Sequence, residues 1–142
     1  MDFFELAQQM AKPSYTAVVL NEASRAKLLS SLPVPTGWEQ FAHHMTINMG
    51  AANKGPAASL LGSDVQLVAN TLGQDETIGI IAVGVETNIP STNKTKHITV
   101  AVNRAAGAKP FFSNKIENWV PMTPIPLSGV VAEVAQGGNI IR

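Results

Sequence analysis

The chain has 142 residues, 45% of them hydrophobic, which suits a single domain spanning residues 1–142 with one modest core. Ten Lys and Arg residues balance ten Asp and Glu residues, so no net field favours long nucleic acid as a partner. The lack of cysteine excludes disulfides, thiolate nucleophiles and Cys-ligated zinc. No apolar run is long enough to span a bilayer and no signal-peptide pattern opens the sequence, so we expect a cytoplasmic protein with no membrane partner.

The first half of the chain predicts two helices and two strands. Apolar residues at helical spacing predict a helix over residues 2–11, and Pro13 ends it. A buried strand follows at 15–20, then a helix at 24–31 with Asn21 as its N-cap. After a turn at 33–37, residues 38–49 lead into and contain a strand, and a connector rich in small residues begins at residue 50.

The second half is richer in strands. The β-rich runs 64–71 and 77–85 predict a hairpin around residues 73–76, and a further strand begins at residue 97. Residues 113–119 predict a short helix capped by Ser113, which later prolines prevent from continuing. A last strand is expected at 127–134, followed by a mobile tail with two glycines. This order of elements indicates a mixed α+β chain.

A short signature occurs twice, as His44-Met45-Thr46 and again as His97-Ile98-Thr99. Successive side chains of a strand point to opposite faces, so each histidine shares a face with the threonine two residues later. The alternate positions are apolar and suit a packed face. Two such strands therefore predict a site in which two imidazoles and two hydroxyls surround one phosphate.

This pair of His-x-Thr strands resembles the 2H phosphoesterase superfamily. The stretches KPSYTAVVLNEASRAKLL, GWEQFAHHMTINMG, KHITVAVNRAAGAKPFFSNKIENWVPM and LSGVVAEV together resemble the phage anti-CBASS nuclease family. The resemblance implies an α+β bilobal fold, in which two pseudo-symmetric antiparallel sheet lobes, flanked by helices, surround a central cleft. It also implies cleavage of cyclic oligonucleotide second messengers, and thus a role in immune evasion inside a bacterial host.

Carried over to this chain, the resemblance makes His44 and His97 the catalytic pair and Thr46 and Thr99 the ligands of the nonbridging phosphate oxygens. Histidine can act as acid or base near neutral pH, so 2′-hydroxyl attack on a 3′-5′ phosphodiester needs neither metal nor cofactor. Which imidazole is the base stays open, as do the preferred ring size, base and linkage and the oligomeric state.

Three further residues are candidate substrate ligands. Tyr15, the preferred candidate, and then Trp119 could stack on a nucleobase, with core packing as the alternative for both. Lys109 could meet a phosphate or lie in a solvated turn. Strand alternation places His43 on the face opposite His44, which favours a structural role for it. Trp38 is expected to be structural, and Gly137 and Gly138 belong to a tail that could act as a lid.

Two other functions stay open. An enzyme that processes RNA ends with 2′,3′-cyclic phosphates would use the same four residues, although the neutral charge disfavours a tRNA-sized partner. A protein that sequesters nucleotides would not need two titratable groups facing each other. Incubation with a cyclic dinucleotide distinguishes turnover from sequestration.

Overall fold

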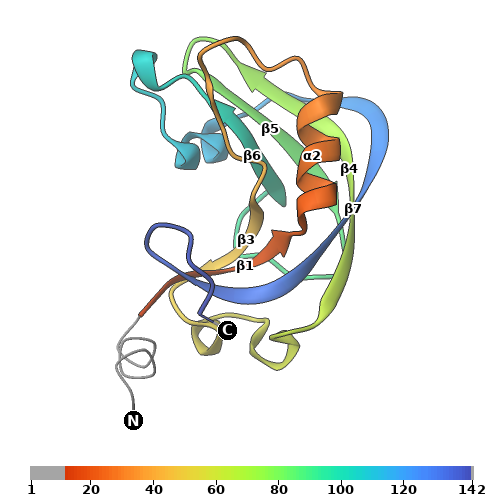
Figure 1. Ribbon diagram of the computed structural model, residues 1–142, viewed down its shortest axis with the longest axis vertical. Helices are drawn as coiled ribbons and strands as arrows, with labels where there is room; N and C mark the ends of the chain where they lie inside the picture. The colour runs from red at the N-terminus through yellow and green to blue at the C-terminus, as the bar shows by residue number, and fades with distance from the viewer. Residues whose placement is uncertain (1–11, 142) are drawn as a thin grey trace.

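The computed structural model describes residues 12–141 (Figure 1). The helix predicted over residues 2–11 therefore lies outside the described residues. In chain order the elements are β1 (Pro13–Leu20), α2 (Glu22–Ser31), β2 (Glu39–Gln40), β3 (His44–Met49), the 3-10 helices η1 (Ala52–Lys54) and η2 (Ala58–Leu60), β4 (Asp64–Asp75), β5 (Ile80–Glu86), β6 (His97–Val102), the 3-10 helices η3 (Arg104–Ala106) and η4 (Pro110–Lys115), and β7 (Trp119–Ala135).

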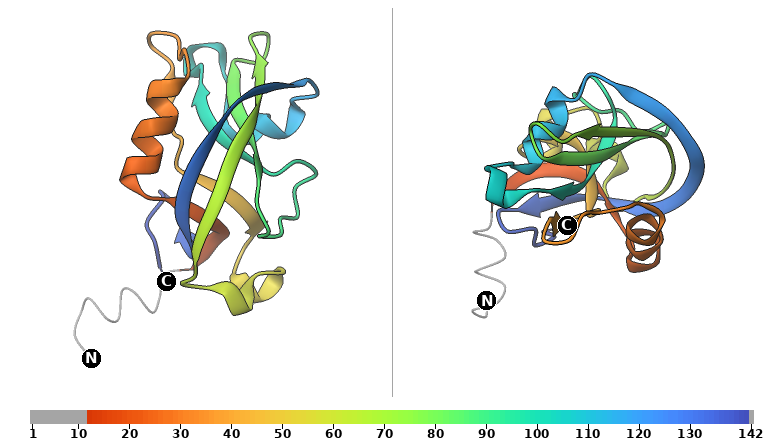
Figure 2. Two further views of the ribbon diagram at one scale, coloured as in Figure 1. Left: turned by 90° about the vertical axis from the view of Figure 1, so that its right-hand side faces the viewer. Right: turned by 90° about the horizontal axis from the view of Figure 1, so that it is seen from above.

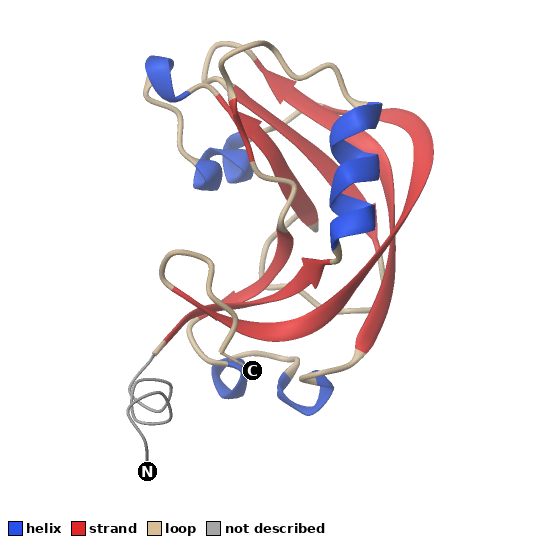
Figure 3. Ribbon diagram, viewed as in Figure 1, coloured by secondary structure: helices blue, strands red, loops and turns tan. Residues whose placement is uncertain are grey.

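Six antiparallel strands close into a barrel. They follow the order β6-β3-β1-β7-β4-β5, and β5 returns to pair with β6, while the short β2 adds to β6 from outside this circle. Strands hold 45% of the described residues and helices 19% (Figure 3). Burial of alternate residues fills the barrel with one large apolar cluster, whose largest members include Leu28, Met45, Ile47, Leu67 and Ile98.

The expected bilobal α+β fold is wrong. Strands β4 and β7 are 12 and 17 residues long and pair with each other from Asp64 to Gly73, as the two ribbons running together in Figure 2 show. Strands β3 and β6, which carry the two motifs, also pair directly. The chain therefore forms one continuous sheet instead of two lobes, and α2 is its one helix longer than two turns within residues 12–141.

Helix α2 begins two residues before the predicted start at residue 24. The side chain of Asn21 accepts a hydrogen bond from the Ser24 amide at 2.8 Å, which confirms Asn21 as the N-cap, and the helix starts at Glu22. It ends at Ser31, before Pro33. Leu28 belongs to the barrel core and is fully buried, so this helix packs against the core through that side chain.

Three local predictions need correction. The hairpin turn lies at residues 76–79, because β4 continues to Asp75, whose carboxylate accepts from the Thr77 amide. The helix predicted at 113–119 is instead η4, which ends at Lys115, and Trp119 already belongs to β7. The tail expected to be mobile folds back on β7, since Val134 bridges Ile140 and the Ile141 amide donates to the carbonyl of Glu133.

One glycine marks the closest approach of two strands. A Cβ at Gly129 would lie 2.5 Å from the carbonyl oxygen of Val19, so β1 and β7 can pack this tightly only with glycine there. As to membranes, no helix within residues 12–141 has both the length and the apolar character needed to cross one.

Candidate functional site

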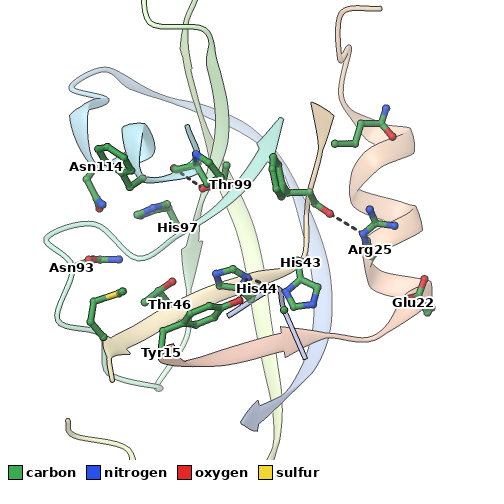
Figure 4. Close-up of a pocket in the computed structure, with 17 residues that line it drawn as sticks. Tyr15, Glu22, Arg25, His43, His44, Thr46, Asn93, His97, Thr99 and Asn114 are labelled. Atoms are coloured by element: carbon green, nitrogen blue, oxygen red, sulfur yellow. Dashed lines mark hydrogen bonds between the residues drawn. The ribbon is translucent and has the colours of Figure 1, made fainter. Parts of the chain in front are cut away.

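Both His-x-Thr motifs lie on neighbouring strands of the barrel, and their predicted strands are confirmed as β3 and β6. Met45 pairs with Ile98 in the antiparallel register, and both side chains are fully buried in the core. The two motifs flank this pair, and strand alternation turns His44, Thr46, His97 and Thr99 to the face opposite Met45 and Ile98. Figure 4 shows His44 and Thr46 of β3 facing the same cavity as His97 and Thr99 of β6.

These four side chains line one cavity of about 880 Å³. Its other walls come from β1, α2, the segment before β3, the loop before β6, η4 and the folded-back tail. They contribute Tyr15, Glu22, Arg25, Gln40, Phe41, His43, Met49, Asn93, Pro110, Phe111, Asn114, Gly137 and Gly138. Gly137 and Gly138, which lie directly before the segment proposed as a lid, thus form part of the wall.

The protonation of His97 is set by a backbone group. Its Nδ1 lies 2.7 Å from the carbonyl oxygen of Thr95, and because a carbonyl only accepts, Nδ1 carries the proton. Burial lowers the pKa of His97, and the bond to Thr95 partly opposes this. The neutral imidazole consequently has its lone pair on Nε2, which makes that nitrogen a base.

His44 is the most perturbed of the histidines. Its ring stacks on Tyr15 with centroids 4.6 Å apart, and its Nδ1 lies 2.9 Å from Nδ1 of His43 and 3.5 Å from the Tyr15 hydroxyl. Burial, followed by the nearby charges of His43 and His97, lowers the pKa of His44 to about 4. When His43 and Tyr15 donate to Nδ1, the proton of neutral His44 is on Nε2, opposite to the arrangement in His97.

His43 was predicted to lie on the face opposite His44, and this position is wrong. Strand β3 begins at His44, and Ala42 has a positive φ of 50°, so strict alternation does not extend back to residue 43. Its side chain lines the same cavity as His44 and contacts that ring edge-on at 5.2 Å. Burial and then the charge of Arg25 lower the pKa of His43, whereas Glu22 raises it.

Thr99 is held by η4. Its hydroxyl lies 2.7 Å from that of Ser113 and 3.3 Å from the carbonyl oxygen of Pro110. Ser113, predicted to cap a helix, is instead inside η4 and 1% exposed. If Ser113 donates to Thr99, the proton of Thr99 is directed either to Pro110 or to a ligand in the cavity.

Of the three predicted substrate ligands, one lies at the cavity and two do not. Tyr15 lines the cavity, but Trp119 and Lys109 do not. Trp119 packs over Gly73 and against the small apolar cluster around Ile80, with its ring centroid 6.2 Å from that of His97. Lys109 is exposed and precedes η4 as its cap residue. Trp38 packs against the main core, as expected.

Several wall residues were missed by the sequence reasoning. Arg25 comes from the polar face of α2, Asn93 from an irregular segment and Asn114 from η4, and nothing in the local sequence marks any of them as a site residue. Met49 and Phe111 line the cavity while being 72% and 57% exposed. Exposed large apolar side chains beside a polar cavity are typical of ligand contacts, and only the fold reveals them.

No protein-family model, curated protein or solved structure matches this chain. Within residues 12–141, no group of three or more histidine or carboxylate side chains is arranged to hold a metal ion. Metal-free chemistry stays a prediction, and function has to be inferred from the geometry of the site.

Proposed function

We propose that this protein is a metal-independent phosphodiesterase that cleaves 3′-5′ bonds of cyclic oligonucleotides, such as 3′3′-cGAMP, by attack of the neighbouring 2′-hydroxyl. The observation that carries the proposal is that His44 and Thr46 of β3 and His97 and Thr99 of β6, two strands paired at Met45 and Ile98, line one cavity. Two imidazoles and two hydroxyls on adjacent strands can contact a single phosphate from both sides. The resemblance to the phage anti-CBASS nucleases agrees with this chemistry.

The Nδ1 partners of the histidines favour a division of labour. His97, with its proton on Nδ1, accepts the 2′-hydroxyl proton at Nε2 while the 2′-oxygen bonds to phosphorus. The P–O5′ bond breaks, and His44 gives the departing oxygen a proton from Nε2. A bound phosphodiester anion raises the pKa of His44 by attraction, which charges it for this step. The products are a 2′,3′-cyclic phosphate end and a 5′-hydroxyl.

The threonines supply hydrogen bonds to the reacting phosphate. Negative charge grows on the nonbridging oxygens as phosphorus gains a fifth bond, and hydroxyl donors fixed beforehand stabilise it at little cost in reorganisation. Ser113 fixes Thr99 in this way. Around the phosphate, Tyr15, Met49 and Phe111 offer apolar surface for nucleobases.

The biological part of the proposal follows from the substrate. Bacterial cyclic oligonucleotides are made in the cytoplasm, so we place the activity there. Linearising such a messenger would allow a phage to evade CBASS immunity.

The test is incubation of wild type and a His44→Ala, His97→Ala double variant with 3′3′-cGAMP and with cyclic triadenylate in EDTA, followed by mass spectrometry. We expect linear products from wild type alone, because each acid or base step contributes about 10²- to 10⁴-fold. A ring whose attacking 2′-hydroxyl is replaced by hydrogen should be inert. Intact rings with wild type, or cleavage of the deoxy ring, would refute the proposal.

A further inference from the structure

One end of the cavity carries a fixed cation. Arg25 projects from α2, and its Nε donates a hydrogen bond of 2.7 Å to the carbonyl oxygen of Phe41, which orients the planar guanidinium (Figure 4). Within residues 12–141 the two terminal nitrogens of Arg25 have no hydrogen-bond partner, and no carboxylate lies within 4.0 Å of them. A guanidinium held at one nitrogen and open at the other two is suited to bind phosphate oxygens in pairs.

Arg25 lines the same cavity as the four motif residues His44, Thr46, His97 and Thr99, here called the quartet, but is not one of them. His43 contacts His44 on one side, with 2.9 Å between their Nδ1 atoms. On the other side, Arg25 is near enough for its charge to lower the pKa of His43, in addition to the larger effect of burial. Figure 4 shows His43 between His44 and Arg25 along the cavity wall. The wall therefore presents the reacting centre first, then a further imidazole, then a guanidinium.

The size of the cavity also exceeds what one phosphate needs. Small-molecule sites in proteins hold about 300–1,000 Å³, and this one, at about 880 Å³, lies near the upper end. A ligand that fills it extends well beyond the quartet, toward α2 on one side and toward η4 on the other.

We propose that Arg25 forms a second phosphate subsite, so that the cavity takes oligonucleotides with at least two phosphates, one between His44 and His97 and the other on the guanidinium. This inference rests on the proposed function, because it assumes that the quartet holds the scissile phosphate. It names the substrate class: ring dinucleotides, and linear dinucleotides with a terminal phosphate, bind better than dinucleotides with a single bridging phosphate.

Glu22 tunes this subsite. It lies three residues before Arg25 on the same helix and lines the same cavity. Its carboxylate repels a bound phosphate without pairing with Arg25 at contact distance. Replacing it with glutamine removes that repulsion, so Glu22→Gln should tighten the binding of a two-phosphate ligand.

The test is calorimetry of ligand binding in the His44→Ala, His97→Ala background, which keeps the ligand intact, with and without Arg25→Gln. The two probes are 3′3′-cGAMP, with two phosphates, and the linear dinucleotide ApG, with one. We expect Arg25→Gln to weaken the binding of 3′3′-cGAMP by about 10- to 100-fold, the usual range for lost hydrogen bonds to a charged group. The binding of ApG should weaken by less than about threefold. Arg104→Gln, at an exposed arginine paired with Glu39 and outside the cavity, should change neither.

The two probes separate the possible failures. An equal loss of affinity for both ligands would mean that Arg25 only supports the fold through Phe41, and no loss for either would mean that the second phosphate lies elsewhere. Each of these results overturns the subsite. So does a background protein that does not bind 3′3′-cGAMP more tightly than ApG. The proposed function fails on a different measurement, namely the absence of turnover by wild type. A protein that binds both ligands with the expected pattern but cleaves neither would keep the subsite as a two-phosphate binding site and lose the catalytic proposal.

Discussion

The depressed pKa of His44 makes a quantitative prediction about folding stability. Unfolded, the imidazole titrates near 6.5, whereas burial, with the nearby charges of His43 and His97, lowers the pKa in the folded protein to about 4. As the pH falls below 6.5, the unfolded chain takes up this proton and the folded protein does not. The stability present above pH 6.5 is therefore lost progressively down to about pH 4 and changes little below that value.

The size of the effect follows from the two pKa values. Between pH 7 and pH 4.5, proton binding by residue 44 of the unfolded chain lowers the free energy of unfolding by about 2.5 kcal/mol. That is a large share of the roughly 5–15 kcal/mol that stabilises a typical domain. His44→Gln removes the titration while keeping a polar side chain, so the variant should lose about 2.5 kcal/mol less than wild type over this pH range.

The assay is urea unfolding of both proteins at the two pH values, in a buffer without phosphate so that no anion occupies the site. The histidines at 43 and 97 remain in both proteins, and their contributions largely cancel in the comparison. Met49→Gln, at a 72% exposed position of the same strand, controls for the new amide and should behave as wild type. Equal losses in wild type and His44→Gln would show that the imidazole is hydrated and that its pKa is ordinary.

Two further predictions concern neighbours of the four motif residues, and a third concerns the packing of the barrel strands. His43→Ala should lower kcat about tenfold or more, because His44 loses its partner at Nδ1. His43→Asn, whose amide can hydrogen-bond to Nδ1 of His44 as donor or acceptor, should restore most of kcat. Equal kcat in both variants would dismiss His43 as a positioning residue. Ser113→Ala should lower kcat about 3- to 10-fold with little change in KM, because Thr99 then loses the hydrogen bond, worth about 1 kcal/mol, that orients it; an unchanged kcat would contradict this. Gly129→Ala should lower the free energy of unfolding by about 1–3 kcal/mol, since the new methyl group meets the Val19 carbonyl; wild-type stability in urea unfolding would contradict the close packing of β1 and β7.

The local pattern of the sequence predicted strands better than it predicted their assembly. The apolar positions of residues 44–49 and 97–102 alternate, and alternation is a property of a single strand, so β3 and β6 could be expected from the sequence. Closure depends on β5 meeting β6 and on β7 pairing along β4, and neither contact leaves a local signature. The bilobal expectation came from the resemblance, and the pairing of these long strands overturns it.

The site shows the same division between local and long-range information. The motif residues and Tyr15 come together because each lies on a strand whose face could be inferred. His43 was misplaced because one positive φ, at Ala42, interrupts the alternation just before the strand. Arg25 and Phe111 reach the cavity from α2 and η4, and their positions depend on how those elements pack on the barrel.

The register of β3 and β6 accounts for the chemistry without any need for two lobes. Met45 and Ile98, the middle residues of the two His-x-Thr motifs, pair across these antiparallel strands, so both motifs face one cavity. A slip of one residue would turn one motif toward the core, and a slip of two would pair like groups or separate the motifs. The buried Met45 and Ile98 side chains oppose the slip of one residue, since it would expose apolar surface to water. Core packing thus keeps both imidazoles and both hydroxyls turned toward the proposed phosphate position.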